Sequence, residues 1–168
     1  MKVWLTRASI LHAFLVLMCS VGATAGTGRI VWNRGDWNTE QIQWLRFQEA
    51  LKLMGKDGRP AVIVFSADWC PHCKRYSRVF RDPEVVELSR KFIMVLVDVD
   101  RDWEINQALG RYGTYVPRTL FVGRDGNVEW ARQGWKPNYP HLLDQSTSGE
   151  LKQLMRDTLA GVKALNLN

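Results

Sequence analysis

Two short, wholly apolar segments, residues 61–65 and 92–97, constrain the fold of this 168-residue chain more than any other feature. Each is bounded by turn-forming residues, which is typical of a strand buried on both faces of a sheet. The sequence between them is helical in pattern, because Pro71 suits a first helical turn and Asp82-Pro83 is a cap followed by a first-position proline. Two buried strands joined by a helical crossover pair in parallel through a right-handed connection.

The other periodic segments extend this pair of strands into an α/β domain. They predict helices over residues 39–54, 103–112 and 150–165, and hairpin strands over residues 118–122 and 128–133. The Asp125-Gly126 dipeptide supplies the tight turn that the antiparallel hairpin needs. We therefore predict one domain over residues 38–168, with a mixed central sheet flanked by helices on both faces.

Residues 1–25 have the pattern of a secretory signal peptide. Lys2 and Arg7 precede an apolar run over residues 10–21, and residues 23–25 form a small-x-small cleavage pattern. A membrane anchor is the less favoured alternative, because the apolar run is short for a bilayer span and is interrupted by His12. We expect cleavage, an N-terminal extension over residues 26–37, and no stable membrane insertion of the mature chain.

Loss of the signal peptide removes Cys19 and leaves Cys70 and Cys73 as the only cysteines. An exported chain with one cysteine pair has no disulfide framework, so the pair is free for chemistry. The net charge of the full chain is +6, and no block rich in lysine and arginine occurs. This mild excess does not predict nucleic-acid binding. The C-terminus carries no endoplasmic-reticulum retention signal, so we expect the periplasm or the extracellular space.

The cysteines lie in the tetrapeptide Cys70-Pro71-His72-Cys73, shortly after the first apolar segment. A thiolate, not a thiol, attacks a disulfide, and a helix N-terminus stabilises negative charge. We therefore predict that Cys70 is the nucleophile and that Cys73, one turn later, resolves the mixed disulfide. Pro71 opens the helix, and His72 can add a positive charge or a hydrogen-bond donor beside the Cys70 sulfur.

Three other uses of the cysteine pair are less favoured. A zinc ion would need further ligands, and the mature chain adds only His72 and His141. A structural disulfide across so short a loop would constrain little chain entropy. A c-type haem site requires histidine directly after the second cysteine, where Lys74 stands. We therefore expect redox chemistry without a metal or a bound cofactor.

The element order, the cysteine pair after the first buried strand and the Val116-Pro117 dipeptide together resemble the thioredoxin fold over residues 38–165. Residues 80–85 and 115–118 are similar to small endoplasmic-reticulum thioredoxins and anterior-gradient proteins. Residues 67–70 and 82–85 are also similar to the periplasmic C-terminal domain of bacterial transmembrane disulfide reductases. The resemblance implies that Pro117 is cis against the cysteines and that the backbone of Val116 pairs with an extended substrate.

Further roles follow from position near the predicted site. Trp69 is expected to form part of an apolar collar around Cys70, and Arg118 either to meet acidic substrates or to be solvated. Thioredoxins bury a carboxylate six positions before the nucleophile, where this chain has Val64. Either resolution is slower here, or Asp68 or water substitutes for that carboxylate.

The predicted function is that of a secreted thiol–disulfide oxidoreductase acting on protein thiols and disulfides. The direction of electron flow stays open, because the tetrapeptide is similar to that of a strongly oxidising periplasmic oxidase while other resemblances include reductases. A monomer is expected, with a membrane redox partner as a further expectation. The alternatives are a non-enzymatic client-binding or chaperone module and a dedicated electron-transfer partner in cytochrome or metal-centre assembly.

Overall fold

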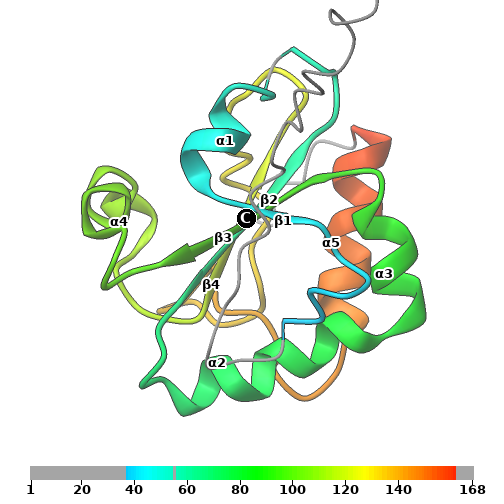
Figure 1. The fold of residues 1–168 in the computed structure, drawn as a ribbon. Helices are drawn as coiled ribbons and strands as arrows, with labels where there is room; N and C mark the ends of the chain where they lie inside the picture. The colour runs from blue at the N-terminus through cyan, green and yellow to red at the C-terminus, as the bar shows by residue number, and fades with distance from the viewer. Residues whose placement is uncertain (1–36, 55, 162–168) are drawn as a thin grey trace, which may run out of the picture.

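The computed structural model describes residues 37–54 and 56–161, which form a four-stranded sheet with helices packed around it (Figure 1). The strands are β1 (Trp44–Leu45), β2 (Ala61–Ser66), β3 (Ile93–Asp98) and β4 (Arg118–Val122), in the spatial order β1-β3-β2-β4. The β2 strand pairs in parallel with β3 and antiparallel with β4, and β1 pairs in parallel with the outer side of β3. The predicted mixed sheet and the parallel central pair are confirmed.

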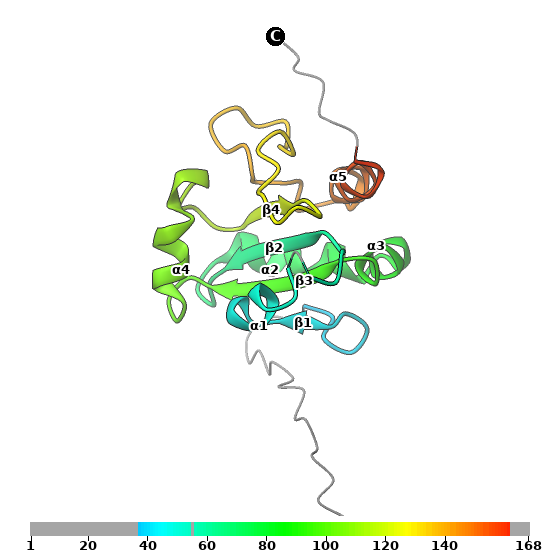
Figure 2. The same ribbon diagram turned by 90° about the horizontal axis from the view of Figure 1, so that it is seen from above.

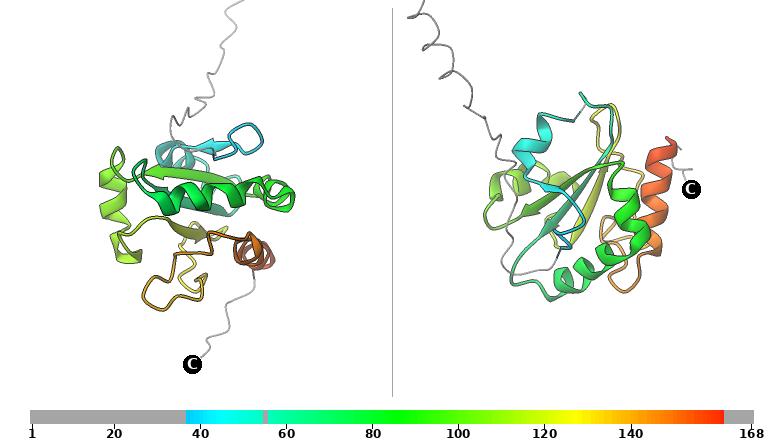
Figure 3. Two further views of the ribbon diagram at one scale, coloured as in Figure 1. Left: turned by 90° about the horizontal axis from the view of Figure 1, so that it is seen from below. Right: turned by 45° about the vertical axis from the view of Figure 1, so that its right-hand side comes forward.

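Each residue of the central strands is buried, which explains why both apolar runs are continuous. Val62 and Val64 of β2 face one core cluster, while Ile63 and Phe65 face a second cluster on the other side of the sheet. The first cluster is covered by α2, α3 and α5, and the second by α1 and α4. Figure 2 shows α4 on one side of the sheet and α3 with α5 on the other, and the left view of Figure 3 repeats this from the opposite side.

The crossover between β2 and β3 contains the segments that carry the site. The α2 helix (Pro71–Tyr76) continues as a 3-10 turn, η1 (Ser77–Arg81), and α3 (Pro83–Ser89) follows. Asp82 caps α3, because its Oδ1 accepts the backbone N–H of Glu84 at 2.8 Å and of Val85 at 3.4 Å. Asp82 therefore fixes where η1 ends and α3 begins, and the predicted helix cap is confirmed.

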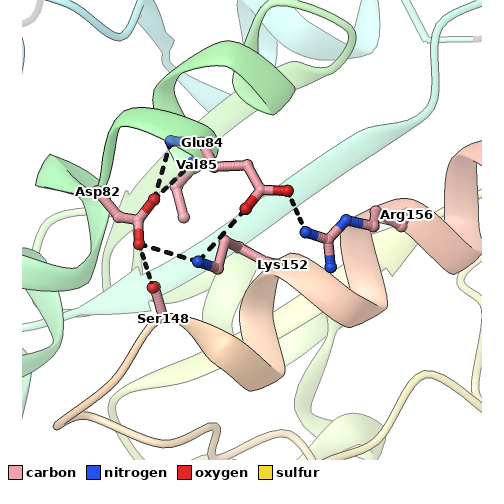
Figure 4. Close-up of polar contacts among 6 residues, drawn as sticks. All are labelled: Asp82, Glu84, Val85, Ser148, Lys152 and Arg156. Atoms are coloured by element: carbon pink, nitrogen blue, oxygen red, sulfur yellow. Dashed lines mark hydrogen bonds and ion pairs between the residues drawn. The ribbon is translucent and has the colours of Figure 1, made fainter.

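The same aspartate also ties α3 to the last helix, α5 (Gly149–Ala160). Its Oδ2 accepts the Ser148 hydroxyl and lies 3.1 Å from Lys152 Nζ (Figure 4). The Ser148 hydrogen bond, followed by the contacts with Lys152 and the α3 amides, lowers the pKa of Asp82 to about 2. The Asp82 carboxylate thus connects the start of α3 to the start of α5, and Asp82 and Ser148 are 66 residues apart in sequence.

Replacing Asp82 by alanine is expected to lower the free energy of unfolding by about 2 kcal/mol at pH 7, from the lost cap and the lost link to α5. Because the folded pKa is depressed, this contribution is present above the unfolded value near 4 and is lost as the pH falls toward 2. Urea unfolding at pH 7 measures the effect. The control is Glu87→Ala, which removes an exposed pair with Arg90 and should cost less than about 0.5 kcal/mol. Equal losses in both variants would contradict the role given to Asp82.

Two predicted elements differ from the observed ones. The helix predicted over residues 39–54 is wrong in its first half, where β1 forms and only α1 (Phe47–Leu51) is helical. Trp44 instead pairs with Met94 of β3 and donates its indole N–H to the Trp37 carbonyl at 2.7 Å. Sheet pairing with a distant strand therefore overrides the local helical period.

The predicted hairpin strand over residues 128–133 is also wrong, since only one bridge forms, between Val122 and Val128. The Arg132 side chain bonds the Glu129 carboxylate and the Asp157 carbonyl of α5, and local turn bonds replace a strand ladder. The helix predicted over residues 103–112 is α4 (Trp103–Ala108) followed by η2 (Gly110–Tyr112). The helix predicted over residues 150–165 is α5 (Gly149–Ala160), which ends earlier than predicted because Gly161, with φ of 65°, caps it.

The predicted signal peptide, Cys19, most of the predicted N-terminal extension and residues 162–168 lie outside the described residues. Within the described ranges, no helix is long and apolar enough to cross a membrane.

Candidate active site

The two cysteines lie where β2 gives way to α2, at the end of the sheet nearest that helix (Figure 1). Cys70 is the residue before α2, with extended backbone angles, and Cys73 is inside the helix. The backbone N–H of Cys73 donates to Cys70 Sγ at 3.1 Å. Both residues are free thiols and only 2% exposed. The predicted strand, turn and helix therefore bring both sulfurs together at one helix terminus.

Cys73 is held in its protonated form. Burial, followed by hydrogen bonding with Cys70, raises the pKa of Cys73 to about 12, and contacts with the Ala67 backbone and the Ser66 side chain offset this only in part. A thiol with so high a pKa does not compete with its neighbour for an incoming disulfide. The pair is therefore asymmetric in the way expected for a nucleophile and a resolving thiol.

Ser66 is a site residue that we did not predict. Val64, at the position of the carboxylate found in thioredoxins, is fully buried, and Asp68, its proposed substitute, is exposed. Ser66 instead hydrogen-bonds Cys73 and favours its thiolate. The signal was available in the sequence, because the two-residue period of a strand places Ser66 on the same face as Val64.

The peptide bond between Val116 and Pro117 is cis, as predicted. Cys70 Sγ lies 3.7 Å from the Val116 carbonyl oxygen, which accepts the thiol hydrogen although the two residues are 46 positions apart. Pro117 is buried and Val116 half-buried. The start of β4 is thus placed directly against the reactive sulfur.

Trp69 and Pro71 are both exposed next to Cys70. The Trp69 side chain is 66% exposed, and its indole N–H donates to the Asp100 carboxylate at 2.9 Å. This bond fixes the orientation of the indole ring that directly precedes Cys70. The collar role given to Trp69 stays a prediction.

His72 is exposed, and its ring points to two neighbours outside the cysteine pair. Its Nδ1 lies 2.7 Å from Oε1 of Gln145 and 2.7 Å from Nη2 of Arg75. The guanidinium can only donate and the amide oxygen can only accept, so Nδ1 makes one of these hydrogen bonds at a time: it accepts from Arg75 when it carries no hydrogen and donates to Gln145 when it carries one. The segment before α5 therefore contacts the residue that separates the two cysteines.

The expectation that Arg118 meets acidic substrates or solvent at the surface is wrong, because the residue is 0% exposed. Its guanidinium carbon lies 3.7 Å from the centre of the Phe65 ring, its β2 partner in the sheet. The segment around His141 covers it, since the Thr119 N–H donates to the His141 carbonyl and the His141 N–H to the Tyr115 hydroxyl. Burial lowers the pKa of Arg118 to about 10, which leaves it charged at neutral pH.

His141, at 1% exposure, packs edge-on against the rings of Tyr112 and Trp130. Burial, followed by the charge of Arg118, lowers the pKa of His141 to about 4, so its ring is neutral at pH 7. Neither ring nitrogen has a hydrogen-bond partner among the described residues. No group of three or more His, Cys, Asp or Glu side chains that could hold a metal ion occurs in residues 37–54 and 56–161.

Sequence comparisons point to one family. A family model described as thioredoxin-like matches residues 43–123. The anterior gradient protein 2 homolog of Homo sapiens is 28% identical over 128 residues, covering 76% of this chain and 71% of that protein. Thiol:disulfide interchange protein DsbD of Ralstonia nicotianae is 30% identical over 115 residues, covering 67% of this chain and 18% of that protein.

A comparison of structures supports the fold independently. The crystal structure of a disulphide isomerase from Xylella fastidiosa Temecula1 matches with a TM-score of 0.50 at 23% identity, covering 79% of this chain and 95% of that chain. The matched segment in the family comparison runs from β1 to the end of β4 and includes both cysteines and Pro117. On the agreement of sequence and sheet topology, residues 43–123 form a thioredoxin-like domain.

Proposed function

We propose that this protein is an exported thiol–disulfide oxidoreductase that acts on protein thiols and disulfides through Cys70 and Cys73. One observation carries the proposal: Cys70 Sγ accepts the Cys73 N–H and lies against the Val116 carbonyl, while the neighbouring Cys73 is held as a thiol. The names of two relatives, a thiol:disulfide interchange protein and a disulphide isomerase, support the same chemistry.

In the reducing direction, the Cys70 thiolate attacks one sulfur of a substrate disulfide. A bond forms between Cys70 and that sulfur, the substrate S–S bond breaks, and the leaving thiolate takes a proton from water. Cys73 then loses its proton and attacks Cys70 Sγ, which releases the second substrate thiolate and closes the Cys70–Cys73 disulfide. The substrate gains two electrons and the cysteine pair loses two. The oxidising direction is the reverse, with a substrate thiolate attacking the Cys70–Cys73 disulfide.

Ser66 assists the second step in this proposal. When Cys73 loses its proton, the Ser66 hydroxyl can donate to the new thiolate, as can the Ala67 N–H. The Ser66 hydroxyl only donates this hydrogen bond and is not a base, so water takes the proton that leaves Cys73. Trp69, His72 and Val116 contact the substrate in this scheme, and no bound cofactor takes part.

The partners of the reaction can be captured because the second step requires Cys73. A Cys73→Ala variant, produced in the native compartment, is expected to accumulate mixed disulfides between Cys70 and its substrates, which mass spectrometry identifies after alkylation. Diverse adducts would support a general oxidoreductase, whereas one dominant adduct would indicate a dedicated electron carrier. A Cys70→Ala variant is the matched control and should trap nothing. The absence of adducts with Cys73→Ala would contradict the proposal.

A further inference from the structure

A polar groove lies beside the redox pair, between the α2–η1 segment and the residues that lead into α5. Its volume is about 410 Å³. Arg75 and Arg78 line one side, and Gln145 and Thr147 line the other. Figure 1 shows α2 and the segment leading into α5 next to each other at the same end of the molecule. The groove therefore lies at the end of the molecule that carries α2.

Two contacts connect the groove to the reactive residues. Gln145 and Arg75, from opposite walls, both reach Nδ1 of His72 at 2.7 Å. His72 stands between Cys70 and Cys73 in the helix. The groove walls therefore contact the residue that separates the two cysteines.

The charged side chains that the α2–η1 segment contributes to this groove are positive. The α2–η1 segment, Pro71–Tyr76 followed by Ser77–Arg81, carries two arginines that line the groove and no acidic residue. Arg75 and Arg78 are both exposed. Arg75 uses one guanidinium nitrogen on His72, which leaves further N–H donors for a ligand. Two exposed guanidinium groups on one helical face attract carboxylates.

The single acidic residue among those lining the groove, Asp82, does not cancel this charge. Figure 4 shows that both oxygens of Asp82 are engaged, by the backbone of Glu84 and Val85 and by Ser148 and Lys152. The Lys152 ammonium lies 3.1 Å from Asp82 Oδ2 and balances its charge locally. Arg75 and Arg78 are therefore left to interact with a ligand.

We propose that this groove binds an aspartate or glutamate side chain of the substrate protein, from an acidic segment that flanks the cysteine exchanged with Cys70. The proposal rests on the proposed function and names a class of substrate for it. Arg78, with Arg75 beside it, pairs with the carboxylate, and the Thr147 and Gln145 side chains form the opposite polar wall. Arg75 and Arg78 are positioning residues in this scheme, because they hold the substrate and take no part in the exchange of sulfur bonds.

Matched peptides test the proposal. Two peptides with the same internal disulfide differ only in the residues flanking the attacked cysteine, two glutamates in one and two glutamines in the other. The second-order rate constant for their reduction is measured with the full mature protein at low salt. The wild type is expected to reduce the glutamate peptide about fivefold faster than the glutamine peptide. In 0.5 M salt this ratio should fall toward one.

Within each variant, the glutamate-to-glutamine ratio is the readout, so a general change in activity cancels. Arg78→Gln is expected to bring the ratio to about one, and Arg75→Gln to lower it. The matched control is Arg90→Gln, which removes the same charge at an exposed position just after α3 and should keep the wild-type ratio. A wild-type ratio near one, or a ratio that survives Arg78→Gln and Arg75→Gln combined, would overturn the proposal.

A separate measurement distinguishes failure of the groove from failure of the proposed function. Reduction of 2-hydroxyethyl disulfide, which carries no charge, reports whether the wild type exchanges thiols at all. Should it be inert, the proposed function is wrong, and binding of fluorescent, cysteine-free versions of the two peptides still tests the groove. Preferential binding of the glutamate peptide that is lost in Arg78→Gln supports the groove, and equal binding of both peptides contradicts it.

Discussion

Replacing Cys70 by serine is expected to abolish thiol–disulfide exchange, with a fall in the rate constant on the order of a thousandfold or more. A serine hydroxyl is not ionised near neutral pH and does not replace the thiolate. The remaining thiol does not take over, because Cys73 lies inside α2 and burial, first of all, raises its pKa to about 12. Reduction of a peptide disulfide, followed under single-turnover conditions, measures the loss.

The matched variant for this experiment is Cys73→Ser. It keeps the nucleophile, so it should release one substrate thiol per protein molecule and then stop at a mixed disulfide with Cys70. No thiol release by Cys70→Ser, compared with one thiol released by Cys73→Ser, would distinguish the nucleophile from the resolving cysteine. If the Cys70 and Cys73 variants lost the first step equally, the asymmetric assignment would be wrong.

Acidification from pH 7.5 to pH 5 is expected to cost about 2 kcal/mol of folding stability through His141 alone. In the folded protein, burial and then the charge of Arg118 lower the pKa of His141 to about 4, compared with 6.5 for the exposed side chain. The unfolded chain therefore binds a proton as the pH falls below 6.5, while the folded chain does not. Stability is fully present above that value and is lost as the pH falls toward 4.

Urea unfolding of the wild type and of His141→Gln at both pH values measures this effect. The variant lacks the titrating ring and should lose about 2 kcal/mol less than the wild type between pH 7.5 and pH 5. Most carboxylates titrate below this window and contribute little. Arg90→Gln is the control, because it changes an exposed side chain and keeps His141, and its loss of stability between the two pH values should equal that of the wild type. The same loss in His141→Gln as in the wild type would rule out His141 as the origin.

The local sequence pattern correctly predicted the strands that are buried on both faces of the sheet and the helix that begins with a capping residue and proline. Strands β2, β3 and β4 lie within one residue of their predicted bounds, and helix α3 begins at Pro83 as predicted, because an unbroken apolar run or a cap followed by proline has few alternative structures. In the two misassigned segments, the spacing of the apolar residues is compatible with more than one secondary structure. Trp44 became part of an edge strand because it pairs with β3, and residues 128–133 formed only the Val122–Val128 bridge because Arg132 bonds to α5.

At the site, the sequence by itself determined that a cysteine pair opens a helix after a buried strand, and the family resemblance implied that the Val116-Pro117 bond is cis. Spacing along one helix is a local property, so Cys70 and Cys73 could be identified without a structure. Tertiary structure alone decided the surroundings of that pair. Burial of Arg118 beneath His141, and the groove between Arg75 and Gln145, both bring together residues from separate segments of the chain. Their charge and solvation depend on packing across the sheet, which no local pattern encodes.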